Sequence, residues 1–356
     1  MRVGLVLGAG GVLGGAWLTG GLKALAEHTD WDPGSAEYVV GTSAGSVIGA
    51  LVAAGVPPWF MVAHSAGESF DGLTGPDGRP ASEASRSAGG GIRLQRALPR
   101  LGPGSLRMAW NTLGQPLNHT PLQVLAGWVP AGLFSTDPIK DTVRRAVPTG
   151  WAPHPNFWPV ATDYRSGKRT VFGRMGSPQA ELADAVAASC AVPGLYRPVK
   201  IGDRHYVDGG VCSVSNLDLL AGKGLDLVIC LNPTSSRQAT QSGGVRGRIS
   251  GAARRAIGRR LGYEAKKVRA TQTDVVIIQP TAEDLELMGL NLMSSERRHD
   301  VIELAVRTVG EQLRDPDITP WLGDLPPGEP HKIRRPSGKP STWPELMPAA
   351  RTRKAA

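Results

Sequence analysis

Cysteines and clustered metal ligands are scarce in this chain of 356 residues. Its three cysteines, Cys190, Cys212 and Cys230, are too few for a disulfide framework and form no CxxC pair, which excludes the common redox and zinc motifs. The seven histidines show no metal-ligand spacing, so neither a metal nor a cofactor is expected. Unpaired cysteines fit a reducing compartment, and we expect a cytoplasmic protein.

Uninterrupted hydrophobic runs are also missing. Val3–Leu22 has no charged residue over 20 positions, but eight of them are glycine, which lowers helix propensity and hydrophobicity together. The segment also lacks the basic start and the cleavage site of a signal peptide. Val39–Val56 is interrupted by glycine, serine and threonine. The sequence therefore predicts a soluble or peripheral protein with no signal peptide and no transmembrane helix.

Acidic residues are rare in two basic segments. Residues 235–270 hold ten Lys and Arg and one acid, and residues 331–356 hold seven against one, whereas the rest of the chain is mildly acidic. Within Arg248–Ala270 apolar residues recur at helical spacing, with basic residues on the opposite face. Such a segment either packs as a surface helix or docks on an anionic membrane with its apolar face in the interface. Nucleic acid is not expected, because Tyr263 is the only aromatic residue there.

Two successive patterns of strand, glycine turn and helix open the chain. Arg2–Leu7 and Glu37–Val40 are apolar runs typical of buried strands, and the helical patterns that follow them end near Glu27 and Ala54. This order predicts parallel β-structure covered by helices. Further strands are expected at Phe157–Asp163, Thr170–Arg174, Arg204–Val207, Leu225–Leu231 and Asp274–Gln279, and further helices at Pro121–Pro130, Pro138–Val147, Gln179–Ser189, Arg248–Ala270 and Ser294–Leu313.

The chain is expected to divide into one large domain and a tail. The domain covers residues 1–320, with an inserted helical cap at about 57–155 that includes an irregular Gly-, Ser- and Pro-rich stretch at 70–116. Residues 321–356 are basic and rich in proline, and we expect them to be poorly ordered.

A serine turn follows the second strand. Gly41-Thr42-Ser43-Ala44-Gly45 matches G-x-S-x-G between an apolar strand and a helix, which is the setting of a nucleophile elbow. Such a turn strains the serine backbone and projects its Oγ from the sheet edge, beside free amides at the start of the helix. The alternative is a turn that only caps the helix. The context favours Ser43 as a nucleophile.

A glycine loop, Gly8–Gly14, follows the first strand. It departs from a dinucleotide-binding fingerprint, because Leu13 stands where the last glycine belongs and no acid ends the second strand. It also lacks the lysine of a P-loop. Since both loops follow strands at their carboxyl ends, the amides of this loop can face Ser43 as an oxyanion hole. A flexible glycine turn is the alternative.

A serine nucleophile needs a proton acceptor. None of the seven histidines lies in a catalytic setting, although a triad of Ser43, Asp208 and His299 can be assembled. Asp208 ends a strand before Gly209 and Gly210, which presents its carboxylate on a tight turn that could reach Ser43. Burial would have to raise its pKa above about 3.9 to make it an effective base.

Together these motifs resemble the patatin-like phospholipases. In the order of that family, they are the glycine loop Ala9–Gly14, the serine turn Gly41–Gly45, the segment Ala188–Gly194 (ASCAVPG, like A-S-x-A-x-P-G) and the turn Asp208–Gly210. The resemblance spans roughly residues 1–232. It implies a three-layer α/β/α fold with a mainly parallel central sheet and an inserted helical cap.

The same resemblance implies the site residues and the reaction. Ser43 is the nucleophile, Asp208 the proton acceptor, and the amides of Ala9, Gly10 and Gly11 the oxyanion hole. The reaction is hydrolysis of fatty-acyl esters of lipids through an acyl-enzyme, without metal or cofactor. The supporting glycines of the motifs are Gly14, Gly41, Gly45, Gly209 and Gly210.

The sequence departs from the family pattern at three positions, of which Leu13 bears on the preference for a phospholipid head group more than on hydrolysis. Ala9 replaces the first glycine of the family's loop, and Leu13 replaces a basic residue that could meet a phosphate. The Asn-x-Pro that follows the aspartate turn in the family is here Ser215-Asn216-Leu217, without the proline.

The sequence leaves open the role of the inserted cap and two alternative functions of the protein. The cap's aromatic residues either cover an acyl channel or only pack the cap; they are Trp59, Phe60, Trp110, Trp128 and Phe134. The alternative functions are an α/β-hydrolase-type esterase with the histidine triad, and a catalytically weak lipid-binding relative.

Overall fold

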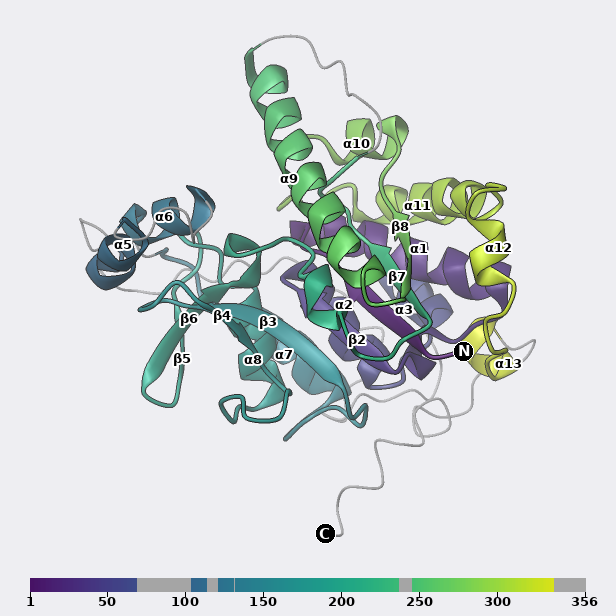
Figure 1. The fold of residues 1–356 in the computed structure, drawn as a ribbon, viewed down its shortest axis with the longest axis horizontal. Coiled ribbons are helices and arrows are strands. Elements are labelled where there is room, and N and C mark those ends of the chain that lie inside the picture. The colour runs from purple at the N-terminus through teal and green to yellow at the C-terminus, as the bar shows by residue number, and fades with distance from the viewer. Residues whose placement is uncertain (69–103, 114–120, 131, 237–244, 336–356) are drawn as a thin grey trace.

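A computed structural model describes residues 1–68, 104–113, 121–130, 132–236 and 245–335 (Figure 1). The strands are β1 (Val3–Leu7), β2 (Tyr38–Thr42), β3 (Phe157–Asp163), β4 (Arg169–Val171), β5 (Val199–Ile201), β6 (Arg204–Asp208), β7 (Leu227–Leu231) and β8 (Asp274–Ile278). The longer helices are α1 (Gly11–Thr29), α2 (Ala44–Ala53), α3 (Pro58–Ser65), α5 (Leu106–Leu113), α6 (Pro121–Trp128), α7 (Asp137–Ala146), α8 (Leu182–Ser189), α9 (Val245–Arg269) and α11 (Arg298–Leu313). Short helices are α10 (Ala282–Met288), α12 (Thr319–Leu322) and α13 (Pro330–Ile333), with the 3-10 turns η1 (Pro33–Ser35), η3 (Gly209–Val211) and η4 (Leu217–Leu220).

The central sheet is mixed and mostly parallel. Its strand order is β5-β6-β3-β2-β1-β7-β8, and β4 pairs with β3 beside this path. The neighbouring strands β3, β2, β1, β7 and β8 run parallel to one another. Strands β4 and β6 are antiparallel to β3. The parallel strands are buried along most of their length, as expected for strands that have helices on both faces.

Successive side chains of a strand point to opposite faces of the sheet, and a separate hydrophobic cluster covers each face. Leu5 and Leu7 of β1 pack with α1, α2 and α11, whereas Val6 points to the other face, where α9 and η4 pack. In Figure 1, α9 crosses in front of β7 and β8, and α1 lies behind them. The three-layer α/β/α fold with a mainly parallel sheet is confirmed.

The helices of the inserted segment differ in what they pack against. Trp59 and Phe60 of α3 belong to the main hydrophobic core, as does Val143 of α7. Helices α5 and α6 contact each other at one end of the molecule (Figure 1), and Trp110 and Trp128 are exposed there. Most of the irregular stretch 70–116 lies outside the described residues.

Two expectations from the sequence are wrong. The helix expected from Ser294 starts at Arg298, because residues 291–297 form an irregular strap that packs on the glycine loop. Residues 321–335 are ordered rather than a loose tail: Leu325 and Ile333 are buried, and the carbonyl of His331 accepts a hydrogen bond from Trp59 Nε1 at 2.8 Å. The remainder of the tail, 336–356, lies outside the described residues.

No helix within the described ranges combines the length and the apolar character needed to cross a membrane.

Candidate active site

Ser43 occupies a strained turn between β2 and α2. Its φ of 53° and ψ of −121° lie in a region that non-glycine residues rarely adopt. Its amide donates to Ser189 Oγ at 2.9 Å, and its carbonyl accepts from Ser46 Oγ at 2.6 Å. Because hydrogen bonds fix the backbone on both sides, the strained conformation persists and the side chain stays at the edge of the sheet.

Gly45 lets this turn approach β1 closely. A Cβ at position 45 would lie 2.0 Å from the carbonyl oxygen of Leu7 and 2.7 Å from that of Gly8. The serine turn therefore contacts the end of β1 where the glycine loop begins. This contact explains the glycine two residues after Ser43.

The register of the sheet brings Asp208 to the same level as Ser43. Thr42, at the end of β2, pairs with Val160 of β3, and Asp208, at the end of β6, pairs with the next residue, Ala161. β6 runs antiparallel to β3, so the ends of β2 and β6 meet on either side of one strand. Two residues 165 positions apart thus reach one site.

The Asp208 carboxylate is buried and only partly satisfied. Its Oδ1 accepts from the Gly210 amide at 2.6 Å, and Thr162 Oγ1 donates to the Asp208 carbonyl at 3.0 Å. Asp208 is 5% exposed. Its Oδ2 is buried without a hydrogen bond of regular geometry. The Ser43 hydroxyl nevertheless lies near enough to lower the pKa of the carboxyl.

The electrostatics of the site suit a general base. Burial raises the pKa of Asp208 to about 6, while the Ser43 hydroxyl and the Gly210 amide act to lower it. A carboxylate with this pKa is ionised at neutral pH and a stronger base than an exposed aspartate.

Cys190 lies beside the same groups and is kept neutral. Burial and the charge of Asp208 raise the pKa of its thiol far above the usual value. Its Sγ is 3.6 Å from Ser46 Oγ. A neutral, buried thiol is a weak nucleophile.

The glycine loop holds the amides expected to form an oxyanion hole. Ala9 is unsuitable as an oxyanion donor, because its amide already donates to the Val214 carbonyl at 2.7 Å. No backbone oxygen in the described ranges accepts the amide of Gly10 or Gly11. Gly11 opens α1 with a φ of 63°, which glycine adopts at little cost. Both residues line the same cavity as Ser43 and Asp208.

A cavity of about 1040 Å³ opens from these groups. Its wall is mainly apolar and comes from α1, α2, α3, α6, α7 and the strap. The apolar side chains include Val12, Val47, Ile48, Leu51, Phe60, Met61, Val129, Ile139, Val192, Leu292 and Met293. This volume and lining are typical of a pocket for an apolar ligand with few polar groups.

Histidines do not join Ser43 and Asp208 among the described residues. His299 Nε2 lies 3.0 Å from Glu303 Oε1 on the exposed side of α11, and His299 does not line the cavity. His64 lines the cavity from α3, and its ring stacks on Phe60. No three His, Cys, Asp or Glu side chains of the described ranges gather as metal ligands would.

Three residues support the site without having been singled out in the sequence. Ser189 accepts the Ser43 amide, Thr162 holds the Asp208 carbonyl, and Asn216 Nδ2 donates to Thr42 Oγ1 at 2.9 Å and to Ser213 O at 2.6 Å. Ser189 and Asn216 fall within family-like motifs, so the sequence marked their positions but not these contacts. Thr162 lies within a predicted strand, and no sequence motif indicated that it contacts the site.

Comparison with known proteins places the chain in a family. The family model described as patatin-like phospholipase matches residues 5–221, which is more than half of the chain. The chain belongs to the patatin-like phospholipase family, whose members are lipid acyl hydrolases.

Individual relatives are distant. NTE family proteins of Mycobacterium bovis and of two strains of Mycobacterium tuberculosis are 32% identical over 108 residues, which is 30% of this chain and 29% of theirs. The match thus spans less than a third of those relatives. VipD from Legionella pneumophila, a solved structure, is 14% identical with a TM-score of 0.41, covering 88% of this chain and 66% of VipD.

Proposed function

We propose that this protein is a serine acyl hydrolase that cleaves fatty-acyl esters of lipids, with Ser43 as nucleophile and Asp208 as its general base. The observation that carries the proposal is the pairing of a strained serine with a buried carboxylate whose pKa is raised to about 6. The apolar cavity of about 1040 Å³ beside them has room for an acyl chain.

Acylation forms one bond and breaks one, and Asp208 carries a proton from Ser43 to the leaving alcohol. Asp208 takes the hydroxyl proton as Ser43 Oγ attacks the acyl carbonyl carbon. The resulting oxyanion accepts hydrogen bonds from the Gly10 and Gly11 amides at the start of α1. When the tetrahedral intermediate collapses, the ester C–O bond breaks, and the alcohol leaves with the proton held by Asp208.

Deacylation repeats these steps with water. Asp208 accepts a proton from a water molecule as the water oxygen attacks the acyl-enzyme carbonyl carbon. The same amides donate hydrogen bonds to the second oxyanion. Collapse releases the fatty acid, and the proton returns to Ser43 Oγ.

Labelling with a fluorophosphonate probe followed by mass mapping tests the nucleophile. We expect modification of Ser43 and loss of both labelling and turnover of p-nitrophenyl esters in Ser43→Ala. Asp208→Asn should reduce turnover at least about 100-fold, within the range typical of general base catalysis. Asp203→Asn is the matched control, because it removes an exposed carboxylate on the neighbouring turn.

Each alternative predicts a different result. Full turnover in both Ser43→Ala and Asp208→Asn overturns the dyad. Loss of turnover in His299→Ala, with a smaller loss in Asp208→Asn, indicates the histidine triad. Vesicle binding without turnover or labelling indicates a lipid-binding relative.

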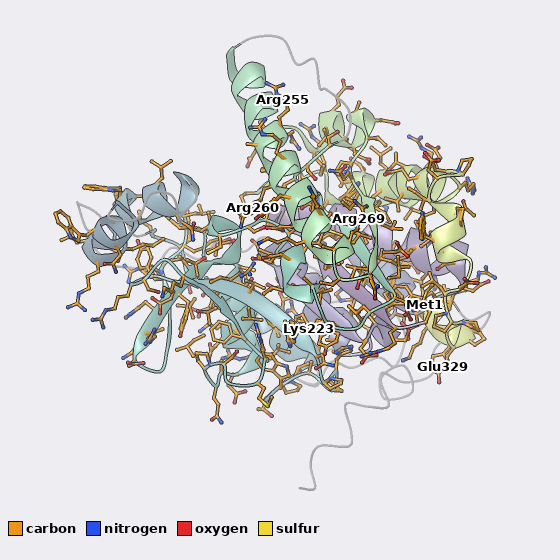
Figure 2. The ribbon with its side chains drawn as sticks, viewed as in Figure 1. Met1, Lys223, Arg255, Arg260, Arg269 and Glu329 are labelled. Atoms are coloured by element: carbon orange, nitrogen blue, oxygen red, sulfur yellow. The ribbon has the colours of Figure 1, made fainter. Side chains whose placement is uncertain are left out.

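We also propose that α9 docks on an anionic membrane, but through its basic face. The apolar residues of its C-terminal half, Leu261, Ala265 and Val268, are buried against the sheet, so they cannot enter a bilayer interface as the sequence suggested. Figure 2 shows Arg255, Arg260 and Arg269 along this helix. Co-sedimentation with phosphatidylglycerol vesicles should exceed that with phosphatidylcholine vesicles and fall with salt. Equal binding to both contradicts this proposal.

A further inference from the structure

Residues 213–217, which we call the bridging turn, join the glycine loop to the serine turn. The Val214 carbonyl accepts a hydrogen bond from the Ala9 amide at 2.7 Å. Asn216 Nδ2 donates to Thr42 Oγ1 at 2.9 Å, on the residue that precedes the candidate nucleophile. Because one short segment bonds to both loops, a shift of this segment moves one loop relative to the other.

The bridging turn contains a backbone conformation that needs support from its surroundings. Asn216 is fully buried, with a φ of 53° and a ψ of 29°, in the left-handed region that residues other than glycine rarely adopt. Its Nδ2 also donates to the Ser213 carbonyl at 2.6 Å, and its Oδ1 accepts from Arg169 at 3.2 Å. The family pattern Asn-x-Pro would place a proline at position 218, where this chain has Asp218. Without the fixed backbone of a proline, hydrogen bonds have to hold this turn.

Glu264 of α9 holds the bridging turn on both sides of Asn216. Its Oε2 accepts from Ser215 Oγ at 2.6 Å and from the Leu217 amide at 3.1 Å. Its Oε1 accepts from Arg260 Nε at 3.0 Å, one helical turn earlier on α9. Hydrogen bonds to an ionised carboxylate are about twice as strong as neutral ones. One side chain thus fixes the residues before and after Asn216.

Packing alone does not explain a carboxylate at position 264. Glu264 is 1% exposed and lies on the face of α9 that buries Leu261, Ala265 and Val268 against the sheet. A buried ion pair adds little to stability compared with apolar side chains of similar volume. Helix α9 also lies beyond residue 221, where the match to the family model ends. The bonds to the bridging turn therefore give the reason for an acid on this buried face.

We propose that Glu264 is a positioning residue for the acyl hydrolase site and acts through the bridging turn on Ser43 and the glycine loop. With the carboxylate in place, the turn keeps its bonds to Thr42 and Ala9, and the Ser43 hydroxyl keeps its distance from the loop amides. Acyl transfer is sensitive to this geometry, because a displacement of about 1 Å can cost about 100-fold in rate. The inference rests on the proposed acyl-ester hydrolysis, to which it adds a residue of α9.

Replacement of the carboxylate by an apolar side chain of similar size tests this role. In Glu264→Met, the Ser215 hydroxyl and the Leu217 amide lose their acceptor while the buried volume changes little. We expect kcat for a p-nitrophenyl ester to fall about 10- to 100-fold, because the reacting groups are displaced. KM should change less than about twofold, because Glu264 does not line the cavity. A loss that lies in KM alone overturns the proposal.

Two further variants separate positioning from a loss of stability. Asp284→Leu is the matched control, because Asp284 is also 1% exposed, accepts hydrogen bonds from Thr281 and Thr308, and does not line the cavity. It should lower the thermal midpoint but change kcat less than about twofold. Glu264→Gln keeps an acceptor oxygen without the charge, so it should lose less kcat than Glu264→Met, about 3- to 10-fold.

Glu264→Gln also carries the test if Glu264→Met does not fold. Equal kcat losses in Asp284→Leu and Glu264→Met, or no loss of kcat in any folded variant of Glu264, overturn the proposal.

Amide hydrogen exchange separates this proposal from the proposed reaction, because it needs no turnover. Peptides that contain the Ala9 and Ser43 amides should exchange at least about 10-fold faster in Glu264→Met than in wild type, and not in Asp284→Leu. If wild type hydrolyses no ester but this difference in exchange is present, the acyl hydrolase proposal fails and the link from Glu264 to the site stands. If wild type hydrolyses esters but neither kcat nor exchange responds to Glu264→Met, the positioning role fails.

Discussion

The backbone amide of Ser43 donates a hydrogen bond to the side chain of Ser189, 146 residues later in the chain, at 2.9 Å. Ser189 Oγ in turn donates to the carbonyl of Val160 in β3 at 2.6 Å. One hydroxyl thereby joins the Ser43 turn, the end of α8 and β3, the strand between Ser43 and Asp208. We regard Ser189 as a positioning residue for Ser43.

Removal of this hydroxyl should impair catalysis more than folding. In Ser189→Ala the buried Ser43 amide loses its acceptor, which costs about 1–3 kcal/mol, and the strained turn loses one of its restraints. We expect kcat for a p-nitrophenyl ester to fall about 10- to 100-fold while KM changes little. Ser177→Ala is the control, because it removes a hydroxyl that bonds the Val171 carbonyl away from the site. Equal kinetic losses in both variants would contradict the positioning role.

The raised pKa of Asp208 predicts the pH dependence of turnover. The base must be ionised, so kcat/KM should rise as pH passes through about 6 and level off above it. A pH–rate profile from pH 4.5 to 8.5 measures this, with circular dichroism at each pH to show that the protein stays folded. A flat profile over this range would rule out Asp208 as the base.

The same pKa predicts that Asp208 destabilises the protein at neutral pH. Its native pKa of about 6 exceeds the ordinary value of 3.8, so the native state binds more protons between these values and its stability falls as pH rises through them. Each pKa unit corresponds to about 1.4 kcal/mol, so Asp208→Asn should raise the free energy of unfolding by about 3 kcal/mol at pH 7.5.

Urea denaturation of this variant at two pH values provides the test. The gain should shrink towards pH 4, where Asp208 is protonated in the native state. Asp203→Asn, which replaces an exposed carboxylate, should show no such gain at pH 7.5. A gain of equal size at both pH values would mean that the charge of Asp208 is not its cause.

Gly45 should tolerate no side chain. Because a Cβ there would lie 2.0 Å from the Leu7 carbonyl oxygen, Gly45→Ala must displace either the serine turn or β1. We expect a loss of stability of at least about 3 kcal/mol, at the severe end for single substitutions. Gly262→Ala in α9 is the matched control: nothing lies within 4 Å of its Cβ, and it should gain about 1 kcal/mol from helix propensity. Similar thermal midpoints for the two variants would refute the argument.

Local patterns in the sequence predicted most elements but not their ends. The strand Phe157–Asp163 was predicted residue for residue, because its short length and the turn signals beside it favour a buried strand over a helix. The helix expected from Ser294 starts four residues later, since residues 291–297 form turns with short-range hydrogen bonds, such as Ser294 N to Asn291 O, and the Leu292 carbonyl accepts from the Leu13 amide. The amphipathic pattern of α9 was correct, but it could not show that the protein's own sheet covers the apolar face.

The sequence by itself determined the chemical groups of the candidate site. It placed a serine on a strand-to-helix turn, an aspartate before two glycines, and a glycine loop after the first strand, because these are local patterns of a few residues. The tertiary structure decided which of them meet. The pairing of β2 and β6 with β3 brings Ser43 and Asp208 to one level, and the Val214 carbonyl accepts the Ala9 amide, which removes it from the candidate oxyanion donors. Burial, which raises the pKa of Asp208, depends on residues far apart in the chain, and packing alone sets it.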